Sequence, residues 1–124
     1  MHSISIARPW LRTGVLLLAL TALCGGCAPS FSFGIPPKVT QLHQLRRGSS
    51  SAADIRRVLG EPRGRGATHI PVGMRTLWLY ESGNFEGSSR RTQLRYLIVF
   101  LDGETYDGYL WFDIDTQFED RHDA

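Results

Sequence analysis

Hydrophobic residues change their spacing twice along the chain. Residues 14–23 form a continuous apolar run, which is too short for a membrane-spanning helix because such a helix needs ~20 residues. Residues 38–47 and 51–59 then place apolar side chains at helical spacing, and after residue 75 the spacing becomes that of extended chain. The pattern therefore predicts an apolar leader, two short helices and a set of strands.

The two predicted helices have local start and stop signals. Residues 38–47 carry a narrow apolar stripe, and Gly48 is placed to end that helix in the left-handed conformation. The second helix begins after Ser51, a good N-cap, with Asp54 at the capping-box position. Gly60 ends it. The helical residues that face a core are expected to be Val39, Leu42, Leu45, Ile55, Val58 and Leu59.

The second half of the domain predicts an antiparallel meander. Residues 60–75, rich in glycine and arginine, are expected to be a loop, and residues 76–80 a first strand. A polar turn over 83–89 leads to a strand at 93–101. Asp102-Gly103 is a strong hairpin signal before a return strand at 104–113.

These elements predict an α+β domain. Two short N-terminal helices pack on one face of a three-stranded antiparallel β-meander, within residues 38–113. Both faces of the last two strands carry apolar residues, and two short helices cannot cover both. One sheet face is therefore expected to be exposed and adhesive. The acidic tail, residues 114–124, is expected to be disordered.

The leader has the features of an export signal. Arg8 and Arg12 precede the apolar run, and the small residues of Cys24-Gly25-Gly26-Cys27 follow it. Gly25 and Gly26 before Cys27 suit a lipoprotein signal peptidase, which makes residues 1–26 a lipoprotein signal peptide. Cys24, preceded by a leucine, is the fallback site. A secretory signal without lipid and a redox Cys-x-x-Cys pair are the alternatives, but the βαβ pattern of redox domains is missing from the sequence.

Lipidation would anchor the mature chain. A diacylglyceryl group and an N-acyl chain on Cys27 give a stable membrane anchor, because one acyl chain alone binds only marginally. Ala28 follows the cysteine in place of the aspartate that retains enteric lipoproteins in the inner membrane, which favours the outer membrane. Residues 27–37 are expected to be the lipidated cysteine and a flexible tether. Phe31, Phe33 and Ile35 alternate within it, so the alternative is that one side of this segment dips into the lipid surface or lies on the domain.

Composition and charge exclude several classes of protein. The chain is 42% hydrophobic and 21% charged, ordinary values for one globular domain. The chain has 14 basic and 12 acidic side chains, and removal of Arg8 and Arg12 leaves the mature part with no net charge. Without a basic field, nucleic acid is not an expected partner. Neither a metal site nor a nucleophile with its base is recognisable, so we predict no cofactor and no enzyme activity.

Residues 42–113 resemble the SmpA/OmlA (BamE-like) family of small outer-membrane lipoproteins. The resemblance lies in Leu45 and Gly48, in Ser51, Asp54 and Ile55, and in three motifs: Leu59-Gly60-Glu61-Pro62, Trp78-Leu79-Tyr80 and Phe100-Leu101-Asp102-Gly103. The segment from Gly48 to Leu59 is one residue longer than is usual in the family.

The resemblance implies a non-catalytic domain that faces the periplasm. It implies an accessory role in the assembly of outer-membrane β-barrel proteins or in envelope integrity, with barrel-assembly or other envelope proteins as partners. The same fold occurs in β-lactamase-inhibitor proteins, so an inhibitor- or chaperone-like binding lipoprotein is the alternative.

Two groups of residues are candidates for contact with a partner or a lipid headgroup. Arg63 and Arg65 lie in the predicted loop and suit an anionic headgroup or an acidic partner, although a plain surface loop explains them as well. The aromatic residues are either core or a binding face, because aromatic side chains and arginine are common interface anchors. They are Trp78, Tyr80, Tyr109 and Trp111.

Overall fold

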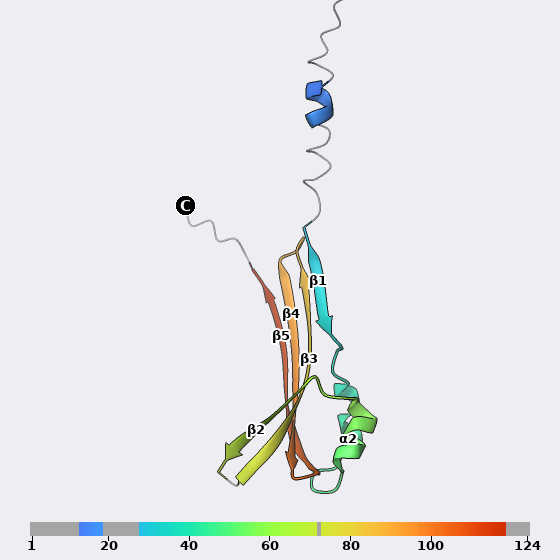
Figure 1. Cartoon of the computed structure of the whole chain (residues 1–124), viewed down its shortest axis with the longest axis vertical. Helices are drawn as coiled ribbons and strands as arrows, with labels where there is room; N and C mark the ends of the chain where they lie inside the picture. The colour runs from blue at the N-terminus through green and yellow to red at the C-terminus, as the bar shows by residue number, and fades with distance from the viewer. Residues whose placement is uncertain (1–12, 19–27, 72, 119–124) are drawn as a thin grey trace, which may run out of the picture.

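The computed structural model describes residues 13–18, 28–71 and 73–118, and these form a mostly antiparallel β structure (Figure 1). Residues 13–18 are helical. The later elements are β1 (Ser30–Gly34), the 3₁₀ helix η1 (Val39–Gln44), α2 (Ala52–Leu59), β2 (Gly64–Ile70), β3 (Gly73–Glu86), β4 (Arg91–Asp102) and β5 (Thr105–Gln117). In the described residues, no helix combines the length and the apolar character needed to cross a bilayer.

The sheet is larger than the sequence predicted. Its strands run in the order β1-β3-β4-β5, and β2 pairs with the other end of the β3 edge that β1 occupies. The expectation of two helices on a three-stranded meander is therefore wrong. The physical reason is the length of β3: its 14 residues offer an edge long enough for β1 at one end and β2 at the other.

Both additional strands lie where irregular chain was expected. The segment 60–75 was predicted as a loop from its glycines, yet Gly64–Ile70 form β2, since an edge strand tolerates glycine better than a central one. Within the expected tether, Ser30–Gly34 form β1 and pair with residues 82–86 of β3. Those β3 residues include most of the predicted polar turn, which the structure places at residues 87–90 instead.

The C-terminal strand is also longer than expected. β5 continues to Gln117 and pairs with β4 as far as Arg91, so residues 114–117 of the expected disordered tail belong to the sheet. Residues 119–124 lie outside the described part of the chain.

The helices follow their local signals closely. Ser51 caps α2 with a complete capping box: its side chain accepts from the Asp54 amide at 3.1 Å, and its own amide donates to the Asp54 carboxylate at 2.9 Å. Gly60 follows the helix with φ 85°. The first predicted helix is a short 3₁₀ helix, and Gly48 beyond it has φ 77°.

The core occupies one face of one end of the sheet. In Figure 1, α2 lies beside the end of the sheet that is farthest from the start of β1. Ile55 of α2 is fully buried against Leu97, Val99 and Leu101 of β4. Tyr80 is also buried, and its hydroxyl donates a 2.8 Å hydrogen bond to the Gly60 carbonyl. Burial raises the pKa of Tyr80 to about 12, which keeps the phenol neutral.

Candidate functional site

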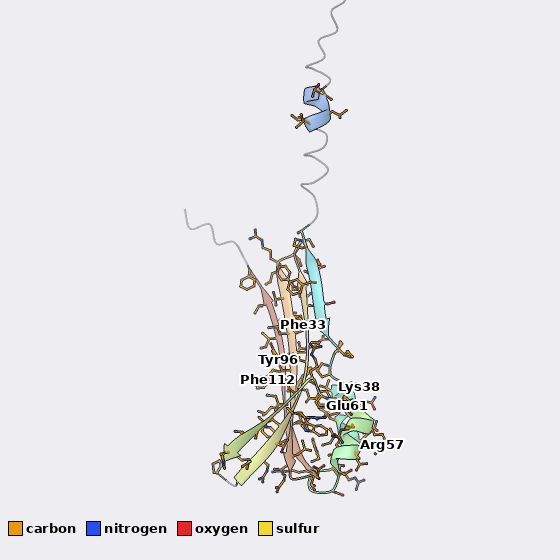
Figure 2. The ribbon with its side chains drawn as sticks, viewed as in Figure 1. Phe33, Lys38, Arg57, Glu61, Tyr96 and Phe112 are labelled. Carbon is orange, nitrogen blue, oxygen red and sulfur yellow. The ribbon has the colours of Figure 1, made fainter. Side chains whose placement is uncertain are left out.

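The sheet has two faces of different character. Successive side chains of a strand point to opposite faces, so the buried positions of β3 and β4 define a helix-covered face, and the alternate positions define an open face. In Figure 2, Tyr96 and Phe112 lie on the side of the strands away from α2. The open face carries Phe31, Phe33, Leu77, Leu79, Phe85, Leu94, Tyr96, Ile98, Phe100, Leu110, Phe112 and Ile114.

We call the part of the open face near the start of β1 the tip half. It contains Phe31, Phe33, Phe85, Leu94, Tyr96, Phe112 and Ile114. The rings of Phe31 and Phe85 lie 5.3 Å apart, which is aromatic contact distance. Phe31 is still 60% exposed, Phe112 is 44% exposed and Ile114 is 42% exposed. Exposed apolar residues on β1 and β5, with the partly buried Phe85, Leu94 and Tyr96 between them, form a patch of the kind that marks an interaction site.

A glycine allows the rings of the tip half to pack on the backbone. Gly83 is buried in β3, opposite Phe33 of β1 and Leu94 of β4. A Cβ atom at Gly83 would lie 2.3 Å from the Phe33 ring and 3.1 Å from the Leu94 side chain. Any larger residue would displace the Phe33 ring, so this part of the open face depends on glycine.

The opposite side of the tip half is charged. At these alternate positions, Arg91 of β4 hydrogen-bonds Asp115 of β5 with its Nε at 2.9 Å, and Arg95 lies 3.6 Å from Asp113. The Arg91 guanidinium holds the pKa of Asp115 below its ordinary value. The tip half thus separates apolar side chains on one face from ion pairs on the other.

The end of the open face near the helices is hollowed. β2 and the beginning of β3 diverge from the other strands there (Figure 1). The side chains that β2 would place over Leu77 and Leu79 are absent, because the opposing residues are Gly66 and Gly64. The result is a groove of about 260 Å³ with a mostly apolar lining of Gly64, Arg65, Gly66, Leu77, Leu79 and Ile98.

The four aromatic candidates lie on the helix-covered face. Trp78 and Tyr80 are core residues with 4% and 6% exposure, and Trp111 packs partly buried against the same core. Tyr109 is 47% exposed. The sheet therefore does not gather these four side chains into one exposed patch.

The two candidate arginines have partners within the domain. Arg63 lies 3.5 Å from Glu81, and Arg65 lies 3.2 Å from Glu61. The Arg65 guanidinium also lies 5.4 Å from the centre of the Trp78 ring, within cation–π range. Both side chains remain more than half exposed, and Arg65 lines the groove.

Other candidate chemistry is sparse in the described part of the chain. No three His, Cys, Asp or Glu residues there gather into a group that would hold a metal ion. The candidate lipid sites Cys24 and Cys27 lie outside the described residues. The alternation of Phe31 and Phe33 in the sequence indicated a one-sided apolar segment. Leu110, Phe112 and Ile114 were not predicted to lie on the exposed face, although their alternation was available as a signal.

Comparison with known proteins gives no relative. The chain matches no protein-family model, no curated protein and no solved structure.

Proposed function

We propose that this chain is a lipid-anchored, periplasm-facing binding module of the bacterial outer membrane that catalyses no reaction. The observation that carries the proposal is the open face: apolar side chains over four strands, exposed on β1 and β5 and partly buried on β3 and β4, which no described helix covers. Contiguous exposed apolar surface is uncommon on soluble monomers and marks sites that bind another surface.

The membrane anchor in this proposal comes from the sequence. The run of small residues that ends at Cys27 supports lipid attachment there, with Cys24 as the fallback. The role as an accessory in β-barrel protein assembly or envelope integrity comes from the sequence resemblance over residues 42–113. The five-stranded sheet departs from the fold that this resemblance implied.

The groove beside β2 is the part of the open face best suited to a protein partner. It has a concave shape, an apolar floor formed by Leu77, Leu79 and Ile98, and Arg65 at its border. An apolar centre with an arginine rim is the usual composition of an interface hot spot.

Mass measurement tests the anchor. The intact mass of the membrane form is expected to match a chain that starts at Cys27 and carries added acyl groups. A soluble mature chain without lipid would refute the anchor.

Crosslinking in membranes tests the groove. Gly66→Glu puts a charged side chain into the groove at a position where an added Cβ meets no atom within 4 Å, so the fold is expected to tolerate it. Ala67→Glu, at the exposed neighbouring position on the opposite side of β2, is the matched control. Barrel-assembly proteins are expected to be captured by the wild type and by Ala67→Glu, and to be lost with Gly66→Glu.

Two results would contradict this assignment. Equal capture by both variants would remove the groove from the binding surface. Recovery of a periplasmic enzyme in place of assembly proteins would favour the inhibitor-like alternative.

A further inference from the structure

The lipid anchor and the tip of the sheet are joined with almost no spacer. Ala28, the residue after Cys27, packs at the turn between β3 and β4: a Cβ atom at Gly87 would lie 3.1 Å from the Ala28 Cβ and 2.2 Å from the Pro29 carbonyl oxygen. Phe31 is four residues from Cys27, which limits their Cα separation to about 14 Å. An acylated Cys27 would therefore hold the tip half within reach of the bilayer surface.

The tip half has the composition of a surface that lies in a membrane interface. Its open face presents aromatic and aliphatic side chains and one charged residue, Glu81 opposite Tyr96, which lies 3.5 Å from Arg63. The other charged residues of these strands point to the opposite face. They are Glu86, Arg91, Arg95, Asp113 and Asp115. This is the arrangement of an interfacial amphipathic helix, carried here by a sheet.

We propose that the tip half of the open face lies against the lipid bilayer, with its charged opposite face toward water. This inference rests on the lipid anchor of the proposed function, because the anchor keeps the face at high effective concentration near the membrane. The occupant is the bilayer rather than a second copy, since the most exposed ring of the patch, Phe31, is also the one nearest the anchor. The groove at the other end of the open face stays free for a protein.

Site-directed spin labelling of the full chain tests this orientation. In a Cys24→Ser parent, single cysteines replace Phe31 and Ile114 on the open face, or Ser32 and Gln117 on the charged side of the same two strands. Each nitroxide-labelled protein is reconstituted in vesicles of phosphatidylethanolamine and phosphatidylglycerol. Collision with apolar oxygen is compared with collision with a water-soluble nickel complex.

The expected result is a contrast between neighbouring residues. The ratio of oxygen collisions to nickel-complex collisions is expected to be severalfold higher for labels at positions 31 and 114 than for labels at positions 32 and 117. Equal ratios at the four positions would overturn the proposal. Exclusion of both reagents from 31 and 114, with spin–spin broadening between chains, would also overturn it and would assign the face to a second copy.

Labelling of the parent protein tests the lipid anchor separately from the orientation of the open face. The Cys24→Ser parent takes up spin label only if the Cys27 thiol is free, so labelling of the parent would refute lipidation. When the parent takes up no label, each variant carries one nitroxide, and the comparison of position 31 with position 32 decides the orientation. A variant that loses the far-UV circular dichroism of the parent is replaced by Phe112→Cys, which lies on the same open face of β5 as Ile114.

Discussion

A pair of leucine substitutions tests the central structural claim, that one sheet face is core and the other is open. Leu97 of β4 is fully buried, whereas Leu110 of β5 is 47% exposed. The two lie in neighbouring registers, since Leu97 pairs with Trp111 and Leu110 pairs with Ile98. The same change to alanine therefore removes the same atoms from the two faces of one strand pair.

The expected losses in the free energy of unfolding differ because only one of the two substitutions leaves a cavity. Leu97→Ala loses the full transfer free energy of the side chain and opens a void among Tyr80, Val99 and Ile55, so unfolding is expected to become easier by about 2–5 kcal/mol. Leu110→Ala loses roughly half of the transfer term and leaves no enclosed void, a cost of about 1 kcal/mol. For a domain of this size each kcal/mol lowers Tm by about 4–8 °C.

Urea unfolding followed by tryptophan fluorescence measures both free energies, and equal slopes for wild type and variants confirm a shared two-state transition. A large and equal cost at both sites would refute the open face and show that another surface covers it. If that surface were a second copy, the midpoint would depend on protein concentration. A small cost at Leu97 would refute the assigned core.

Three further predictions concern local features. Gly103→Ala is expected to destabilise the domain by about 1 kcal/mol or more, because Gly103 has φ 60°; thermal denaturation checks this, and an unchanged Tm would show that the hairpin is wrongly placed. Ser51→Ala is expected to cost about 1 kcal/mol through loss of the capping box, whereas Ser49→Ala, at an exposed position, leaves the urea midpoint unchanged. Arg75 and Arg47 hold the pKa of the Asp107 carboxyl below its ordinary value of 3.8 through hydrogen bonds of 2.8 and 2.9 Å. Asp107 thus binds fewer protons in the folded chain than in the unfolded chain. Its contribution to stability is complete above pH 3.8 and is lost as pH falls through the lowered pKa. Asp107→Asn is therefore expected to reduce the fall of Tm at acid pH, and an unchanged dependence of Tm on pH would contradict this.

Local sequence signals were sufficient to predict the parts of the fold that depend on a few neighbouring residues. Ser51 and Asp54 cap α2 as their spacing predicts, and Gly60 ends the helix. The hairpin after β4 was also correctly located, although its two central residues are Gly103 and Glu104. Of these two residues, Gly103 alone has positive φ, which is the pattern of a type II′ turn.

The sequence also predicted that apolar side chains alternate along the strands, but it did not show which face of the sheet the helices cover. Alternate apolar residues in β3 and β4 establish that two faces exist, and both faces are apolar enough to form a core. Where α2 and η1 pack decides that Trp78 and Tyr80 are buried while Phe112 and Ile114 stay exposed. A strand pattern cannot show this choice, because the packing partner is remote in sequence.

Only the tertiary structure decided that β1 and β2 are strands. Neither segment has a strong pattern of its own, since β2 contains Gly64 and Gly66, and β1 lies between prolines. Each is extended because β3 offers unpaired backbone groups along one edge, and hydrogen bonding to that edge outweighs a weak local preference. The sequence by itself determined the caps, the turn and the alternation. Long-range pairing with β3 placed Phe31 on the open face and Ala28 at the tip of the sheet.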